Sequence, residues 1–376
     1  MSLTQISCEI SQLIEIDTVS KMETVAITGG CGVAGRALVR RLINSDQVKE
    51  IRVLDNNGSS GKTSLDQKLR HYQIDLTDEA AVERALHGCT SVVHLAGPAT
   101  PALYQDKEEK KKMWADSLEA TEVLVDKMLS RGICRLVHVG DAFSSLPVED
   151  NYGLGEDMFS EYPKSYLLGE YGEARTRAEM YARNAVKKNE NFNGIFLRPV
   201  HVHSEGQVSE SMKQLVQLAR EGRLPYVEGK RRGMTQFIYA DNLASIIEAA
   251  IFGLASDPSR YSEEIVYCMD ETNLYPYRDF LERRAKTPLF SANMTESFTS
   301  TWFYHYYQYC RNMFGFTVPE RTLAYPMFRL IFEKTIGFTN KKLRLLMNYV
   351  PEVPQEKALQ LSENIQLDGR TKAKTG

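Results

Sequence analysis

The chain has 376 residues and a mass of 42.7 kDa, which suggests about two domains or one large α/β unit with an appendage. Apolar residues make up 43% of the sequence and charged residues 25%, and this ordinary globular composition excludes wholesale disorder, collagen and coiled coil. The 46 Lys and Arg residues nearly balance the 49 Asp and Glu residues, for a formal charge of −3, so nucleic acid is not expected as a partner.

Residues 1–21 are expected to form an N-terminal extension. They carry Glu9, Glu15 and Asp17, where a secretory signal peptide needs an uncharged apolar stretch, so no signal peptide is predicted. The six cysteines are dispersed without a CxxC pair, which favours reduced thiols and a cytoplasmic location. No apolar run approaches the roughly 18 to 20 residues that span a bilayer.

Residues 22–200 alternate short β-rich apolar runs with longer amphipathic stretches. The expected strands are residues 24–27, 51–54, 72–74, 91–95, 135–139 and 193–197. The expected helices between them cover residues 35–43, 78–85, 115–130 and 171–188. This alternation is typical of a parallel sheet wrapped by helices, so the sequence predicts an α/β fold with a Rossmann-type doubly wound sheet over this part of the chain.

The pattern loosens beyond residue 200. Residues 201–353 mix short polar, aromatic and helical pieces, and they predict a smaller, irregular substrate lobe with C-terminal helices. Within it, the apolar stretch 237–252 is expected to pack back on the Rossmann domain. Residues 354–376 are polar and predict a tail.

The first expected strand runs directly into a glycine-rich loop and a helix. Residues 28–35 are Thr-Gly-Gly-Cys-Gly-Val-Ala-Gly. Glycines allow a diphosphate to approach backbone N–H groups and the positive end of a helix, and the last glycine lets the helix pack tightly on the strand. The predicted cofactor contacts of this loop are Gly29, Gly30, Cys31, Gly32, Val33 and Gly35. The alternative is a strand–turn–helix whose glycines serve only a tight turn.

Asp55 ends the second expected strand, twenty residues past Gly35. A carboxylate at this position receives a ribose 2′-hydroxyl and repels a 2′-phosphate, and residues 56–58 offer no arginine to hold such a phosphate. The sequence therefore favours NAD over NADP. The third and fourth strands end in further expected contacts, which are Asp75 and Leu76 beside the adenine, and Ala96 and Gly97 beside the middle of the cofactor.

The histidines give no sign of a metal site. None of the seven lies in an HExxH pattern or beside paired cysteines. His201 and His203 are therefore expected to be strand or pocket residues, and no metal is predicted.

Seven motifs follow one another along residues 23–326. They are TGGCGVAG (28–35), VLD (53–55), VVHLAG (92–97), RLVHVGD (135–141), YGEARTRAE (171–179), FLRPVHVHSEG (196–206) and FIYADNLA (237–244). Together they resemble the 3β-hydroxysteroid dehydrogenase/isomerase family of the extended short-chain dehydrogenase/reductases. The resemblance implies an NAD-dependent oxidoreductase that acts on the 3β-hydroxyl of a steroid or sterol-like substrate, with Δ5–Δ4 isomerisation as an added step.

The resemblance also implies catalytic positions. In that family a tyrosine is the general base, a lysine four residues later lowers its pKa and binds the nicotinamide ribose, and an upstream serine holds the substrate oxygen. Here Tyr171 falls on the tyrosine position, Arg175 on the lysine position and Asp141 on the serine position. Pro199 falls where the family's backbone meets the nicotinamide carboxamide, and its alternative is a plain strand end.

The two departures leave two functions open. Arg175 keeps a permanent positive charge but cannot pass on a proton. Asp141 opposes an ionised tyrosine, since two like charges about 4 Å apart cost about 4 kcal/mol at an effective dielectric of about 20. An ion pair between Asp141 and Arg175 would cancel both effects and leave Tyr171 an ordinary phenol. The chain is then either an active dehydrogenase, with Ser144 or Ser145 as a substitute hydroxyl, or an impaired NAD-binding member that acts as a ligand-binding or regulatory protein.

The substrate lobe is rich in Phe, Tyr, Met and Leu, which suits a flat apolar molecule. Members of the resembled family are often bound to endoplasmic reticulum or mitochondrial membranes. The aromatic segment 297–310 is therefore expected either to lie along such a membrane surface or to serve as core or homodimer contact.

Overall fold

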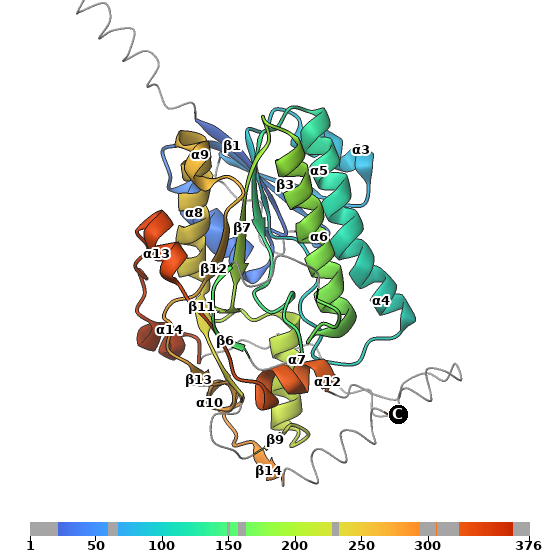
Figure 1. The fold of residues 1–376 in the computed structure, drawn as a ribbon, viewed down its shortest axis with the longest axis vertical. Helices are drawn as coiled ribbons and strands as arrows, with labels where there is room; N and C mark the ends of the chain where they lie inside the picture. The colour runs from blue at the N-terminus through green and yellow to red at the C-terminus, as the bar shows by residue number, and fades with distance from the viewer. Residues whose placement is uncertain are drawn as a thin grey trace, which may run out of the picture.

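The structure is a computed structural model that describes residues 22–58, 67–148, 151–156, 163–227, 233–292, 306 and 323–363. Seven parallel strands form one sheet at its centre (Figure 1). In spatial order they are β12 (Ile265–Cys268), β7 (Asn193–Pro199), β5 (Arg135–Val139), β4 (Ser91–His94), β1 (Glu23–Thr28), β2 (Val48–Asp55) and β3 (Leu69–Gln73). The chain order reverses between β1 and β4, which is the switch point of a doubly wound sheet. The predicted Rossmann-type fold is confirmed.

Helices cover both faces of the sheet. The strand β1 is apolar because it is buried on both sides. All of its residues are buried. Val25 and Ile27 pack in one core cluster with α2 (Val33–Ile43) and α8 (Ala240–Ser256), whereas Ala26 packs in a second cluster with α3 (Glu79–Leu86), α5 (Ala120–Ser130) and α6 (Gly169–Lys188). A parallel strand that is covered on both faces needs apolar residues at nearly every position.

The helix that was expected at 115–130 begins earlier. α4 (Lys107–Trp114) starts at a capping box, in which the Asp106 carboxylate accepts from the Glu109 N–H at 2.8 Å and the Glu109 carboxylate accepts from the Asp106 N–H at 2.9 Å. These two bonds satisfy donors that a helix start leaves free. A π-helical turn, Ala115–Glu119, joins α4 to α5.

The seventh strand, β12, was not predicted. It pairs with β7 through Ile265 and Phe196 and reaches Pro199 at its end. The apolar run of β12 is only four residues long, which is too short to separate from loop by periodicity. α8 packs on α2 and on the sheet, and α9 (Pro258–Tyr261) leads from it into β12.

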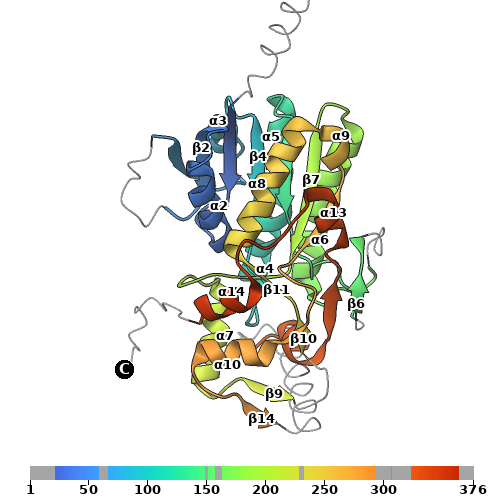
Figure 2. The same cartoon turned by 90° about the vertical axis from the view of Figure 1, so that its left-hand side faces the viewer.

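A smaller lobe, which includes most of the residues after 200, lies beyond the carboxyl ends of the strands (Figure 2). Its helices are α7 (Glu210–Arg220), α10 (Tyr277–Ala285) and α12 (Tyr325–Phe328), followed by a π-helical turn, Arg329–Glu333. Its strands form the pairs β8 (His201–His203) with β11 (Phe237–Tyr239), β9 (Pro225–Val227) with β14 (Phe290–Ala292), β10 (Met234–Thr235) with β13 (Tyr275–Pro276), and β6 (Asn151–Leu154) with β15 (Ile336–Phe338).

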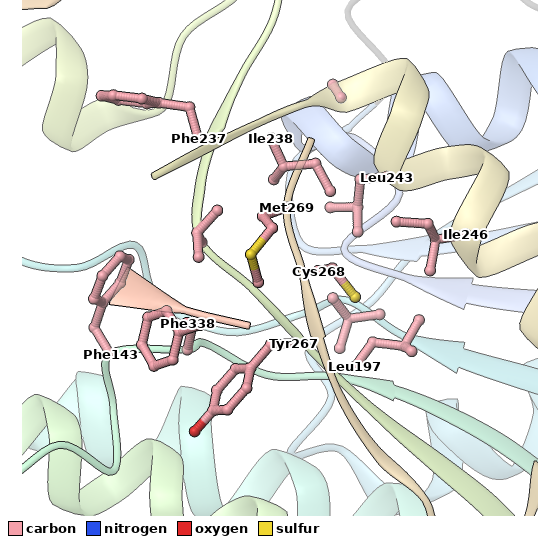
Figure 3. Packing of buried hydrophobic residues seen from close by; sticks show 14 of the residues in the cluster. Phe143, Leu197, Phe237, Ile238, Leu243, Ile246, Tyr267, Cys268, Met269 and Phe338 are labelled. Atoms are coloured by element: carbon pink, nitrogen blue, oxygen red, sulfur yellow. The ribbon is translucent and has the colours of Figure 1, made fainter. Parts of the chain in front are cut away.

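The lobe and the sheet share one apolar core. In Figure 3, Leu197 of β7 and Tyr267 of β12 lie in the same cluster as Phe143 and Phe338. The ring centroids of Tyr267 and Phe338 are 4.3 Å apart, and the ring centroids of Phe143 and Phe338 are 5.8 Å apart. Aromatic contacts of this kind fix the lobe against the strand ends.

The C-terminal part differs from the polar tail predicted for 354–376. α13 (Lys341–Met347) and α14 (Gln355–Leu361) precede the end of the described residues. Gln355 and Ala358 are buried, and so is Ser362 just after the helix. These three positions form a narrow helical stripe of polar and small residues, so apolar periodicity did not reveal it.

No helix in the described part of the chain is long and apolar enough to cross a bilayer. The aromatic segment 297–310 lies outside the described residues except for Tyr306. Its expected contact with a membrane, the core or a second copy therefore stays a prediction.

Candidate active site

A cavity of about 560 Å³ lies at the switch point of the sheet. Residues after β1, β2, β3 and β4 form its walls. They include Gly29, Cys31, Gly32, Arg36, Asp55, Asn57, Asp75, Leu76, Ala96, Gly97 and Asp116. Ligands of doubly wound sheets bind in this crevice, so we assign the cavity as the candidate dinucleotide site.

The glycine loop packs too tightly for side chains. Gly29 has a φ of 68°, and a Cβ on it would lie 2.8 Å from the backbone N and Cα of Ala96. A Cβ on Gly35 would lie 2.5 Å from the Cα of Gly30. The close approach leaves main chain and the start of α2 facing the cavity, as diphosphate binding requires.

The predicted cofactor residues divide into three groups. Those that line the dinucleotide cavity are Gly29, Cys31, Gly32, Asp55, Asp75, Leu76, Ala96 and Gly97. Gly30, Val33 and Gly35 are absent from its lining: Gly35 packs closely on Gly30, and Val33 packs on the core. Tyr171, Arg175 and Pro199 line a neighbouring cavity instead.

Asp55 is held at the end of β2 by the main chain. One carboxylate oxygen accepts from the Cys31 N–H and the other from the Asn57 N–H, both at 2.9 Å. A carboxylate oxygen can accept a further hydrogen bond. The fixed carboxylate can therefore also receive a ribose hydroxyl.

Arg36 is a wall residue that the sequence analysis missed. It lies in the first turn of α2, and its Nε donates to the carbonyl of Cys31 at 2.7 Å. Its guanidinium is a cation at the rim where a diphosphate would lie. The sequence did place a basic residue directly after Gly35, but the glycine pattern ends at Gly35 and does not include the next position.

A second cavity of about 240 Å³ adjoins the first and shares Leu95 and Gly97 with it. One end is polar, with Thr100, Asp141, Tyr171 and Arg175. The remaining walls are largely apolar, and they include Phe143, Val200, Met212, Leu215, Leu243, Phe280, Met327 and Leu330.

Tyr171 and Asp141 form a hydrogen-bonded pair at the polar end. The Tyr171 hydroxyl donates to Asp141 Oδ2 at 2.8 Å, and the Phe143 N–H donates to Asp141 Oδ1 at 2.7 Å. Burial and the charge of Asp141 raise the pKa of Tyr171 above its ordinary value, against a lowering by Arg175. Burial also raises the pKa of Asp141, although four neighbouring groups oppose it. The phenol therefore stays protonated at neutral pH.

Arg175 binds main chain rather than Asp141. Its Nη1 donates to the carbonyl of Ala96 and its Nη2 to that of Val139, each at 3.2 Å. Ala96 lies two residues past the end of β4, and Val139 is the last residue of the adjacent strand β5. The ion pair with Asp141 considered from the sequence is thus not formed, and the carboxylate keeps its charge available to Tyr171.

The chain matches the family described as NAD dependent epimerase/dehydratase family over residues 25–260. It belongs to this family. NAD is the cofactor of the NAD dependent epimerase/dehydratase family, so the cofactor predicted from the sequence is confirmed.

Individual relatives of this family member differ in chemistry. The 3 beta-hydroxysteroid dehydrogenase/Delta 5-->4-isomerase of Vaccinia virus (strain Ankara) is 25% identical over 259 residues, which are 66% of this chain and 72% of the viral protein. The UDP-glucose 4-epimerase of Mus musculus is 24% identical over 238 residues, which are 57% of this chain and 65% of the mouse protein. The UDP-glucuronic acid 4-epimerase of Bacillus cereus, solved in complex with NAD, has a TM-score of 0.64 at 14% identity, over 90% of this chain and 97% of that one. The predicted relationship to steroid dehydrogenases is confirmed, and the substrate stays open.

The polar end of the second cavity presents a hydroxyl other than the expected Ser144 or Ser145. Ser144 Oγ donates to the carbonyl of Asp141 at 2.9 Å, and neither Ser144 nor Ser145 lines the cavity. Thr100 does line it, and its hydroxyl reaches Asp141 Oδ2 at 3.4 Å. Thr100 comes from the loop after β4, far from Asp141 in sequence, so no motif could point to it.

A buried ion pair braces the site helix of this family member from behind. Arg198 of β7 donates to Glu179 of α6 through Nη2 at 2.6 Å and Nε at 2.9 Å, and both side chains are almost fully buried. Bidentate pairing fixes the two elements relative to each other.

Among the described residues, no group of three or more His, Cys, Asp or Glu side chains is arranged to hold a metal ion. His201 lies in the wall of the second cavity and stacks on Phe143 with ring centroids 4.4 Å apart. His203 hydrogen-bonds Ser362 at 2.9 Å.

Proposed function

We propose that this NAD dependent epimerase/dehydratase family member is an oxidoreductase that oxidises the 3β-hydroxyl of a steroid or sterol-like substrate. One observation carries the proposal: the Tyr171 hydroxyl lies in a largely apolar cavity that adjoins the dinucleotide cavity through Leu95 and Gly97. A substrate held against Tyr171 is therefore next to the cofactor site.

The first cavity fits the cofactor. The main chain of the glycine loop and the start of α2 would hold the diphosphate, with Arg36 at the rim, and Asp55 would hold a ribose. The clashes that a Cβ at Gly29 or Gly35 would cause support a loop built for close contact. NAD supplies the hydride acceptor, and the residues of the chain bind the substrate and handle its proton.

The second cavity favours an apolar substrate over a sugar nucleotide. Arg175 is the one Lys or Arg among the described residues that line it, and both of its terminal nitrogens already donate to carbonyls. Burial lowers the pKa of His201 to about 3, so this wall residue is neutral. A nucleotide diphosphate would therefore find little positive charge there. Homodimerisation and contact with the endoplasmic reticulum stay predictions from the resemblance.

Turnover tests the proposal. Purified chain with NAD⁺ and a 3β-hydroxy-Δ5 steroid is expected to form reduced nicotinamide, measured by its absorbance. Tyr171→Phe is expected to lower kcat at least about 100-fold, the usual effect of losing an acid–base group. Tyr181→Phe on the same helix, whose hydroxyl binds Asp126, is the matched control and is expected to keep activity. Folded protein that binds NAD but oxidises no 3β-hydroxysteroid would contradict the proposal.

The alternative is an NAD-binding member without turnover that binds ligands or regulates a partner. The hydrogen bond from Tyr171 to Asp141 favours it, because a protonated phenol is not the base that the resembled family uses. In that case, Asp141→Ser with Arg175→Lys is expected to create activity. Slower turnover in this double variant than in wild type would rule the alternative out.

A further inference from the structure

We propose that Asp141 is the final acceptor of the substrate proton and that Tyr171 passes the proton on to it. This inference rests on the proposed oxidoreductase function and assigns Asp141 a catalytic role that replaces the tyrosinate expected from the resemblance. We call this transfer from substrate through Tyr171 to Asp141 the relay. In it, Asp141 and Arg175, which depart from the family pattern, are both parts of a working site.

The first support is the direction of the hydrogen bond. Tyr171 has one hydroxyl proton and its oxygen lies 2.8 Å from Asp141 Oδ2, which as a carboxylate oxygen can only accept, so the phenol donates. A phenol that donates its proton still has lone pairs with which to accept a hydrogen bond. Both side chains line the second cavity, so a substrate hydroxyl in that cavity can donate to the Tyr171 oxygen.

The proton step balances without any further group. The substrate O–H bond breaks and a new O–H bond forms on Tyr171, while the original Tyr171 O–H bond breaks and an O–H bond forms on Asp141. The C–H bond of the alcohol breaks with both of its electrons, which leave as hydride to NAD⁺. Products are a ketone, NADH and a protonated Asp141, which then loses its proton to water.

The second support is the set of groups that face Asp141. The loop after β4 contributes the Thr100 hydroxyl, the turn after β5 contributes the Phe143 N–H, and α6 contributes Tyr171 and the charge of Arg175. These donors hold the carboxylate in place. Since Arg175 pairs with two carbonyls rather than with Asp141, the carboxylate is free to take a proton.

The third support concerns basicity. A tyrosinate base needs a lowered pKa, whereas burial and Asp141 raise the pKa of Tyr171. Burial raises the pKa of Asp141, which makes the carboxylate a stronger base than an exposed aspartate and brings it closer to the operating pH. In this arrangement the burial of the pair aids the transfer.

Variants of Asp141 test the relay by activity. Asp141→Asn keeps the shape and an acceptor oxygen but cannot take a proton, so kcat for oxidation is expected to fall at least about 100-fold with little change in KM for NAD⁺. Asp141→Ser removes both the proton acceptor and the charge that opposes ionisation of Tyr171. Tyrosinate is then the remaining base, so this variant is expected to be active only at higher pH, and the midpoint of its pH profile is expected to lie above that of wild type. The control is Asp126→Asn, which alters a Tyr–Asp hydrogen bond outside the site. The relay would be overturned if kcat were unchanged in Asp141→Asn, or if the pH profiles of wild type and Asp141→Ser had the same midpoint.

A spectroscopic titration separates failure of the relay from failure of the proposed function. The infrared difference between wild type and Asp141→Asn reports protonation of Asp141, and the ultraviolet difference between wild type and Tyr171→Phe reports ionisation of Tyr171. With NAD⁺ bound at about pH 8, the relay requires an ionised Asp141 and a protonated Tyr171. A protonated Asp141 with an ionised Tyr171 would overturn the relay whether or not a steroid is oxidised. An ionised Asp141 with a protonated Tyr171, but no oxidation of a steroid, would overturn only the proposed substrate.

Discussion

At the level of single residues, Asp55 lies at the end of β2 with each oxygen bound to one main-chain N–H. From its place in the cavity wall we propose two effects, which are attraction of a ribose hydroxyl and repulsion of a 2′-phosphate. Arg36 stands in the same wall with the opposite charge. In this proposal, the balance between the two charges sets how strongly the chain prefers NAD.

Asp55→Asn tests this balance. We expect the Kd for NAD⁺ to rise about tenfold or more, since a hydrogen bond to a charged group contributes about 1.5 to 3 kcal/mol. The Kd for NADP⁺ is expected to fall, because the repelling charge is gone while Arg36 remains. Calorimetric titration of both dinucleotides measures the effect, with Asp46→Asn in the exposed turn before β2 as control. Equal loss of affinity for both dinucleotides would contradict the assignment.

Gly97 sets the position of Arg175. Its φ is 149°, and a Cβ on it would lie 2.0 Å from Arg175 Nη1. Gly97→Ala is therefore expected to displace Arg175 and to lower turnover at least about tenfold, in addition to a backbone cost of about 1 kcal/mol. Gly132→Ala is the control, because Gly132 also has a positive φ but has nothing within 4 Å of its added Cβ. Kinetics and urea unfolding of both variants separate the two effects, and equal kinetic losses would show that Arg175 plays no part.

At the level of elements, α6 brings the site together. Tyr171, Arg175 and Glu179 follow one another at intervals of four residues on this 20-residue helix, and all three are buried. Residues four apart share one face of a helix, so a single stripe carries the phenol, the guanidinium and the brace to β7. The position of α6 against β5 and β7 therefore sets the geometry of the cavity.

Glu179→Gln tests the brace. It leaves the buried Arg198 without its counter-charge, and the loss of one partner of a buried ion pair costs about 3 to 5 kcal/mol. Glu173→Gln on the same helix breaks an exposed pair with Arg177 and is expected to cost less than about 1 kcal/mol. Urea unfolding at neutral pH gives both free energies. Similar values for the two variants would show that the buried pair does not brace α6.

At the level of the whole molecule, buried histidines link the packing to pH. Burial lowers the pKa of His138, His201 and His203 to about 3, and it lowers the pKa of His94 well below its ordinary value. A base with a lowered folded-state pKa binds fewer protons than in the unfolded chain, so stability is lost as the pH falls below about 6.5. Asp270 acts in the opposite sense, since burial raises its pKa to about 7 and favours the folded state on acidification.

Acid unfolding measures these opposing effects. Between about pH 7.5 and pH 5.5, each of the four buried histidines is expected to cost about 1.4 kcal/mol and Asp270 to restore about 2 kcal/mol, for a net loss of about 3.5 kcal/mol. His201→Phe keeps the ring contact with Phe143 and is expected to reduce the loss by about 1.4 kcal/mol. His87→Gln, at an exposed position, is the control. Identical pH dependence in wild type and His201→Phe would contradict a neutral buried His201.

The sequence by itself determined the fold class, the dinucleotide loop and the cofactor. Each of these depends on local order, because a buried strand, its glycine loop and the carboxylate at the next strand end are close along the chain. The predicted strands overlap six of the seven strands of the sheet, although 72–74 covers only the end of β3, and β12 was missed.

Only the tertiary structure decided the hydrogen-bond partners of Tyr171, Asp141 and Arg175. From the sequence, Asp141 was an obstacle to a tyrosinate, and Arg175 was a charge that could pair with it. Folding instead brings the phenol proton to the carboxylate and sends the guanidinium to the carbonyls of two strand ends. Hydrogen-bond direction, burial and the hydroxyl of Thr100 depend on segments that are distant in sequence, and no pattern along the chain records which of the available partners a buried group will choose.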